Sequence, residues 1–192
     1  MKTLAIFDLD GTITDKDTLI EFLSFVNGRL YTYLIFLLLF PLIILFKLKL
    51  LHNEKFKKIV LSIHFKGKDE QLLKAKAKDF IQKIDQCTRA SMQEKLNWHK
   101  ENNHSIVILT ASCDLWVEPW TQKYGYQLIG TELKFKDGVY SGNFSTKNCY
   151  GKEKVNRLNK VLDLNSFDKF YAYGDSKSDR FYIDLADEKI WV

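Results

Sequence analysis

Three strand-like runs of mainly apolar residues stand along this chain, and each ends abruptly at polar residues. They cover residues 4–7, 105–109 and 167–173. Short runs of this kind are typical of strands that are buried on both faces of a sheet. Helical spacing of apolar positions follows the second run at 114–124 and continues from residue 151. Strands alternating with helices predict an α/β fold with a mostly parallel, Rossmann-like sheet.

The long interval between the first two strands is helical in pattern. Asp17 is a suitable N-cap for a helix that Asn27-Gly28 would end, and Gly67 separates two further helical stretches. We therefore expect residues 1–14 and 96–192 to form a core domain, and residues 15–95 an inserted helical cap. A hairpin with a type I′ turn at Asp137-Gly138 and a last strand near residues 190–192 complete the prediction.

Residues 30–46 form an apolar segment without a single charged side chain. Its length reaches the lower limit for a transmembrane helix, roughly 17 residues. One crossing would place the acidic motif before it and the polar motifs after it on opposite sides of a bilayer. Pro41 would also interrupt a continuous helix. We expect two short apolar helices that meet near Pro41. They would lie in one leaflet of a membrane, in the core of the cap, or at an oligomer interface.

Charge is concentrated directly after this segment. The net charge of the 192 residues is +5, yet residues 47–80 alone carry ten lysines against four acidic residues. This excess predicts either peripheral contact of residues 30–58 with an anionic membrane or an ordinary solvated face. Nucleic acid is not expected as a partner. Three scattered cysteines without a CxxC pair, and a strand directly at the N-terminus, favour a cytoplasmic protein, soluble or peripheral and monotopic on the inner face of a membrane.

The first strand ends in the pair Asp8 and Asp10, followed by Gly11 and Thr12. Carboxyl ends of parallel strands form the edge at which α/β sheets bind ligands. Two neighbouring carboxylates repel each other unless a cation lies between them, and oxygen ligands favour Mg²⁺. This pattern predicts a magnesium site at the end of the first strand.

Further polar groups follow the other strands. The second ends in Thr110-Ala111-Ser112, which offers a hydroxyl and backbone amides to a phosphate. The third leads into Asp175 and Asp179. Lys154 lies in the first turn of a helix, where the helix dipole disfavours a cation unless an anion is close.

Together these motifs resemble those of the haloacid dehalogenase-like phosphohydrolases, because residues 8–12 match DxDGT and residues 174–179 match GDxxxD. The resemblance implies a nucleophile, Asp8, and a general acid/base, Asp10. It implies Mg²⁺ held by Asp8, the carbonyl of Asp10, and Asp175, with Asp179 orienting Lys154 or a metal-bound water. Catalysis would also need Lys154, and the phosphoryl oxygens would be held by Gly11, Thr12, Thr110, Ala111 and Lys154.

The implied reaction is hydrolysis of a phosphomonoester through an aspartyl-phosphate on Asp8. The order of motifs resembles the phosphoserine-phosphatase-like branch, although Asp17 and Ala111-Ser112 replace that enzyme's Glu and two glycines. The layout, including residues 149–155, is more similar to phosphatidylglycerophosphatase C. A lipid phosphate is therefore one expected substrate, and a soluble phosphoserine-like or sugar phosphate is the alternative. A non-catalytic binding protein on the same fold is a more remote one.

Overall fold

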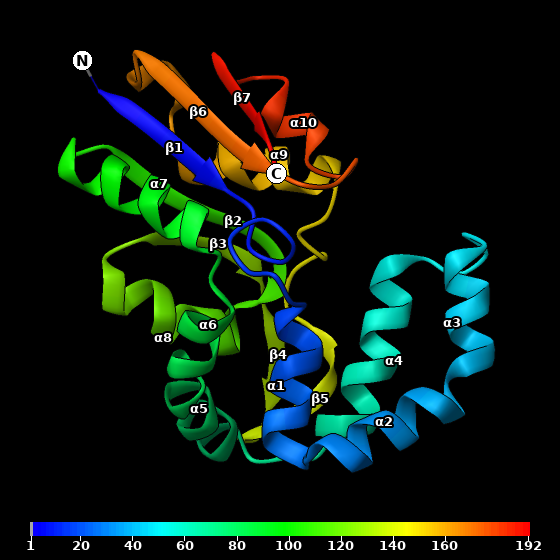
Figure 1. Ribbon diagram of the computed structural model, residues 1–192. Coiled ribbons are helices and arrows are strands. Elements are labelled where there is room, and N and C mark those ends of the chain that lie inside the picture. The colour runs from blue at the N-terminus through cyan, green and yellow to red at the C-terminus, as the bar shows by residue number, and fades with distance from the viewer. Residues whose placement is uncertain (1) are drawn as a thin grey trace.

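A central five-stranded parallel sheet organises the computed structural model, which describes residues 2–192 (Figure 1). The strand order is β3-β2-β1-β6-β7. The strands are β1 (Thr3–Phe7), β2 (Ser105–Cys113), β3 (Gln127–Thr131), β6 (Lys169–Gly174) and β7 (Glu188–Trp191). The predicted α/β fold with a parallel sheet is confirmed. The strand β3 at the sheet edge was not predicted.

Side chains of β1 alternate between two hydrophobic cores, as the period of a strand requires. Ala5 and Phe7 face one core, and Leu4 and Ile6 face the other. The first core is closed by α7 (Ala90–Glu101) and α8 (Asp114–Tyr124). The second is closed by α9 (Lys152–Val161) and α10 (Arg180–Ile183), with a 3₁₀ turn at Leu164–Ser166. Helices on both faces leave the carboxyl ends of the strands as the place for a site.

The segment between β1 and β2 is helical, and most of it lies beyond the carboxyl ends of the strands (Figure 1). Asp17 caps the first helix, as expected, by accepting hydrogen bonds from the amides of Leu19 and Ile20. The helix α7 crosses the expected boundary at residues 95/96 and packs against β2. The helices before α7 are α1 (Thr18–Asn27), α2 (Arg29–Leu38), α3 (Phe40–Lys47), α4 (Asn53–Phe65), α5 (Glu70–Asp79) and α6 (Ile81–Cys87).

The hairpin of β4 (Leu133–Lys136) and β5 (Val139–Phe144) packs against α4. Its turn residues, Asp137 and Gly138, both have positive φ, as a type I′ turn requires. A hydrogen bond from the amide of Glu70 to the carbonyl of Gly138 ties the turn to α5. The hairpin is therefore part of the helical layer beyond the strands, although the core segment supplies its residues.

The apolar segment forms two helices with a bend of 65° between them. The break is at Leu39, and Pro41 lies in the first turn of α3, where a missing N–H costs nothing. No single helix within residues 2–192 is long and apolar enough to span a membrane, whereas α2 and α3 together meet the criteria of length and composition. None of the residues of α3 is buried, whereas Leu39 lies in the hydrophobic core and Ile35, Phe36 and Leu42 pack against it. One side of the segment therefore docks on the core, and the rest is exposed.

A buried histidine of α7, His99, packs against Phe7 of β1 and Tyr173 of β6. The ring nitrogens of His99 lie 2.7 Å from Nδ1 of His104 and 2.9 Å from the hydroxyl of Tyr173. Burial lowers the pKa of His99 to about 4, and the charges of His104 and Lys95 add to this effect. The folded protein therefore favours the neutral ring.

This histidine predicts a loss of stability in acid. In the unfolded chain His99 binds a proton below about pH 6.5, whereas the folded protein binds it only below about pH 4. The free energy of unfolding should fall across this window and level off below it, by about 3 kcal/mol from this group. Urea unfolding of the protein and of a His99→Gln variant at several pH values measures the difference. Parallel pH profiles of the two proteins would contradict the assignment.

Candidate active site

The three polar motifs that follow β1, β2 and β6 converge at one edge of the sheet. These strands are neighbours, and all are parallel, so their carboxyl ends lie side by side. Asp8 follows β1 directly, Thr110 lies near the end of β2, and Asp175 follows β6. The site is thus assembled from residues far apart in the sequence by the order of the strands.

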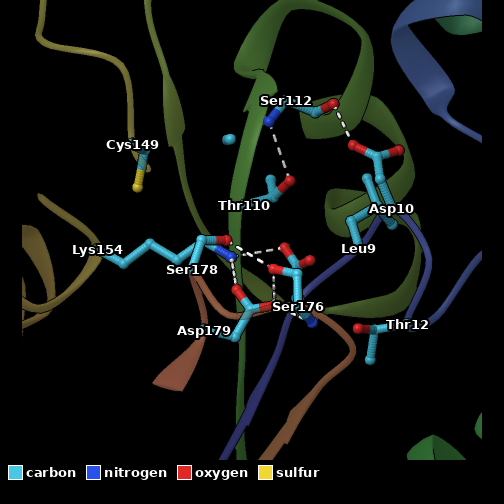
Figure 2. Close-up of polar contacts among 12 residues, drawn as sticks. Leu9, Asp10, Thr12, Thr110, Ser112, Cys149, Lys154, Ser176, Ser178 and Asp179 are labelled. Carbon is cyan, nitrogen blue, oxygen red and sulfur yellow. Dashed lines mark hydrogen bonds and ion pairs between the residues drawn. The ribbon is translucent and has the colours of Figure 1, made fainter. Parts of the chain in front are cut away.

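Lys154 connects two of these motifs. Its ammonium donates to Oδ1 of Asp8 at 2.8 Å. It also donates to Oδ1 of Asp179 at 2.6 Å (Figure 2). All three side chains are buried. Lys152, two residues earlier in the same helix, points instead toward the ring of Phe181. The structure therefore brings Lys154, and not Lys152, to the acidic group.

The charges of this group depend on one another. Burial works against the charged form of Lys154, but Asp8 and Asp179 outweigh it and raise the pKa of this lysine. Burial raises the pKa of Asp8 to about 7, although the Lys154 ammonium lowers it. The ammonium of Lys154 alone thus does not offset the cost of burying the carboxylates of Asp8 and Asp179, and a further cation at the site would be favourable.

The arrangement of carboxylates fits a divalent cation. Oxygens of Asp8, Asp175 and Asp179 lie within 4.8 Å of one another. Asp179 is already occupied, because it accepts from Lys154 and from the amide and hydroxyl of Ser176. Asp8 and Asp175 are consequently the better ligands. Burial, with the charge of Asp179, also raises the pKa of Asp175, which a bound cation would reverse.

The turn after β1 brings the backbone close to Asp175. Gly11 has a φ of +86°, and a Cβ at this position would lie 2.4 Å from a carboxylate oxygen of Asp175. Only glycine combines this conformation with this contact. Thr12 donates its hydroxyl to Oδ1 of Asp175 at 3.2 Å. Gly11 and Thr12, which we expected to touch phosphate, thus contact the carboxylate after β6.

Thr110 and Ala111 lie in the wall of the same cavity, together with Asp10. The hydroxyl of Thr110 accepts a hydrogen bond from the amide of Ser112 at 3.0 Å. The carboxylate of Asp10 accepts one from the hydroxyl of Ser112 at 2.5 Å (Figure 2). Ser112 is a site residue that we did not predict. The signal was present, since Ser112 is two residues after Thr110 in a strand and so shares its face.

The predicted location of Lys57 was wrong. We grouped it with the lysines that would face an anionic membrane, but its ammonium donates to the carbonyl of Ala111 at 2.6 Å and lies in the cavity wall. Lys58 pairs with Glu54 on the same helix. Two of the lysines within residues 30–58, Lys57 and Lys58, therefore contact other groups of the protein, and Lys57 belongs to the site.

The cavity at the acidic group has a volume of about 190 Å³. This volume admits a phosphoryl group and a small part of its alcohol, but not a drug-sized molecule. A larger groove of about 980 Å³ lies between α8, β3 and α9, and none of the clustered aspartates lines it. The chemistry of the chain therefore belongs to the smaller cavity.

Comparison with known proteins agrees with this geometry. The haloacid dehalogenase-like hydrolase family matches residues 5–181 of the chain. Protein CicA of Caulobacter vibrioides is 31% identical over 189 residues, which cover 97% of this chain and 84% of that protein.

Solved structures share the fold over nearly the whole chain. A protein of unknown function from Bordetella pertussis has a TM-score of 0.81 at 22% identity, covering 97% of this chain and 87% of the other. An apo phosphoserine phosphatase has a TM-score of 0.67 at 17% identity, covering 97% and 84%. At these identities the likeness concerns the fold.

Proposed function

Since this chain belongs to the haloacid dehalogenase-like hydrolases and is a phosphatase, we propose that it hydrolyses phosphomonoesters. In this proposal the reaction depends on Mg²⁺, and Asp8 is the nucleophile. The observation that carries the proposal is the group at the strand ends formed by the buried Asp8, Lys154 and Asp179 with the exposed Asp175 beside them. It combines a carboxylate for attack, a cation for phosphoryl oxygens and ligands for a metal. These are the parts that phosphoryl transfer requires.

Each residue of the site has its own role in the proposed reaction. An oxygen of Asp8 forms a bond to phosphorus while the bond between phosphorus and the alcohol oxygen breaks, and Asp10 gives that oxygen a proton. Asp10 then takes a proton from the water that attacks the aspartyl-phosphate. This second attack releases inorganic phosphate and restores the carboxylate of Asp8. Lys154, Thr110 and the amide of Ala111 hold the phosphoryl oxygens meanwhile.

Asp8, Asp175 and the carbonyl of Asp10 would hold the magnesium ion. When bound, the ion offsets the repulsion between a carboxylate and a phosphate dianion. Asp179 orients Lys154, since Ser176 and the ammonium together fix both of its oxygens. Chelation of divalent cations should accordingly stop turnover, and added Mg²⁺ should restore it.

For the substrate we propose a phosphorylated lipid headgroup. The exposed apolar surface of residues 30–50 favours this class over a soluble ester. Leu30, Leu38 and Leu50 are exposed by 76%, 75% and 72% of their surface, although water disfavours such side chains. Apolar patches of this size mark an interaction site. Arg29, Lys47 and Lys49 flank the patch and suit anionic headgroups.

The position of this surface also suits a lipid. Asn53 and Lys57 line the cavity, and Asn53 lies only six residues after the end of α3. The helix α3 lies on the outer side of α4, and α2 crosses the end of α4 that is farther from the sheet (Figure 1). A headgroup phosphate could enter the small cavity while the acyl chains stay with the apolar helices in one leaflet.

A double variant tests the lipid proposal. Leu37→Asp with Leu38→Asp places charges on the apolar surface, and should weaken sedimentation with vesicles of phosphatidylglycerol and phosphatidylcholine by about tenfold or more. Hydrolysis of phosphatidylglycerophosphate in mixed micelles should fall in parallel. Hydrolysis of nitrophenyl phosphate should stay unchanged, because neither leucine lines the cavity.

Leu185→Asp is the matched control, since Leu185 is exposed on a different part of the molecule. It should change neither vesicle binding nor lipid hydrolysis. If the protein ignores vesicles and prefers phosphoserine or glycerol phosphate, the lipid proposal fails. The phosphatase chemistry would then remain, and the alternative of a soluble substrate would replace it.

A further inference from the structure

The carboxylate of Asp10 is held on both of its oxygens. Oδ1 accepts from the amide of Thr18 at 2.7 Å, and Oδ2 accepts from the hydroxyl of Ser112 at 2.5 Å. The amide belongs to the first residue of α1, and the hydroxyl belongs to β2. Asp10 also lines the cavity. Its orientation therefore depends on two elements that are 94 residues apart in sequence.

The contact with Ser112 is the end of a longer chain of hydrogen bonds. Oγ of Ser112 lies 3.1 Å from Oγ1 of Thr18, and the indole nitrogen of Trp116 donates to that same Oγ1 at 3.2 Å. Thr18, Ser112 and Trp116 are exposed by 2% or less of their surface. Trp116 in turn stacks on Phe22 of α1, with ring centroids 5.1 Å apart.

The direction of this chain follows from the donors available. An indole N–H can only donate, so Thr18 accepts from Trp116. The hydroxyl hydrogen of Thr18 has one acceptor within the described residues, Oγ of Ser112. The hydroxyl hydrogen of Ser112 then goes to Asp10. The reverse direction would leave the hydrogen of Thr18 buried without a partner, which costs about 1–3 kcal/mol.

We propose that Ser112 is the positioning residue of Asp10, as the last donor in a one-way chain from Trp116 through Thr18. This inference rests on the proposed role of Asp10 as acid and base. Ser112 and the Thr18 amide each occupy one lone pair of the carboxylate. Asp10 lines the cavity, and each of its oxygens keeps a further lone pair. The chain thus fixes the carboxylate and leaves it able to exchange the catalytic proton with the alcohol oxygen of the substrate.

The leaving group provides a selective test. An alkyl phosphate releases a strongly basic alkoxide unless an acid protonates it, whereas nitrophenolate leaves without help. The quantity kcat/KM reports the steps up to alcohol release. We expect Ser112→Ala to lower kcat/KM for glycerol phosphate by about tenfold or more, out of the roughly 10²–10⁴-fold that general acid catalysis supplies. The kcat/KM for nitrophenyl phosphate should fall far less.

Thr18→Val provides a second variant in case Ser112→Ala does not fold. It keeps the shape of the side chain and removes only the hydroxyl, so the alkyl-to-aryl ratio should fall in the same direction. Ser112→Thr restores a hydroxyl and should recover the ratio. Thr121→Val removes a buried hydroxyl that donates to the carbonyl of Glu118 in α8, away from the cavity, and should leave the ratio unchanged.

One result would overturn the inference: an alkyl-to-aryl ratio that is unchanged in both Ser112→Ala and Thr18→Val, whether the two esters are hydrolysed as before or lose kcat/KM equally. The Asp8→Asn variant separates this failure from a failure of the proposed function. If Asp8→Asn is inactive on both esters while the ratio does not respond to Ser112, only the positioning role is wrong. If Asp8→Asn retains turnover, the proposed function itself is wrong.

Discussion

Replacing Asp8 by Asn is expected to lower phosphate release by at least about 10⁴-fold on every substrate. The amide has the shape of the carboxylate but cannot form an aspartyl-phosphate. Folding should be retained. Burial raises the pKa of Asp8 to about 7, so the ionised side chain is already disfavoured, and Lys154 keeps Asp179 as a partner.

The measurement is phosphate release with Mg²⁺ at saturating nitrophenyl phosphate, with urea unfolding as the check on folding. Mass spectrometry of the variant excludes reversion of the asparagine to aspartate. Asp184→Asn, which alters a surface ion pair with Arg180, is the control and should be fully active. Turnover of the Asp8 variant above a few per cent of the unmodified protein would contradict the nucleophilic role.

The second large effect is expected for Lys154→Met, and it concerns stability and activity together. The substitution leaves Asp8 and Asp179 buried without their shared cation. Removing one partner of a buried ion pair costs about 3–5 kcal/mol. Phosphate release should also be lost, because Lys154 is the one lysine that reaches both carboxylates.

A double variant separates these two effects. Adding Asp179→Asn to Lys154→Met removes one of the unpaired charges, so the free energy of unfolding should recover in part. Activity should not recover, since no cation returns to the phosphoryl site. Lys152→Met, two positions earlier in α9, should change neither quantity. A Lys154→Met protein with unmodified stability or activity would refute this assignment.

The central strands could be predicted because they are buried on both faces. β1, β2 and β6 have runs of apolar or aromatic residues that end at charged or hydroxyl side chains, and adjacent parallel strands place those ends together. The edge strand β3 was not predicted. Its sequence, Gln127–Thr131, has no clear alternation. It also contains Gly130, where a Cβ would lie 3.2 Å from the carbonyl of Ser112.

The spacing of Ser112 indicates that it shares a face with Thr110, but the partners of Ser112 and Lys57 could not be predicted, because those partners are distant in the sequence. Ser112 reaches Asp10 across 102 residues, and Lys57 reaches Ala111 across 54. A serine in a strand and a lysine in a basic helix have ordinary local patterns. Only the packing of α1 and α4 over the strand ends directs these side chains into the site.

The apolar segment was predicted in part. Pro41 indicated two helices, and the structure has them, with a break at Leu39. Composition alone could not decide whether the leucines of residues 30–46 would be buried or exposed, because both arrangements have the same pattern. The exposure of Leu37 and Leu38, at the end of α2, follows from how the two helices dock, with α3 beside α4 and α2 across the end of α4 that is farther from the sheet.

Locating the covalent intermediate tests the role of Asp8 as nucleophile most directly. The protein is mixed with a phosphomonoester and Mg²⁺, quenched in acid during turnover, and digested for mass spectrometry. We expect one phosphoryl group on Asp8, which hydroxylamine removes and which is absent from Asp8→Asn. Continued turnover with no phosphoryl group on Asp8, or with one on another residue, would contradict it.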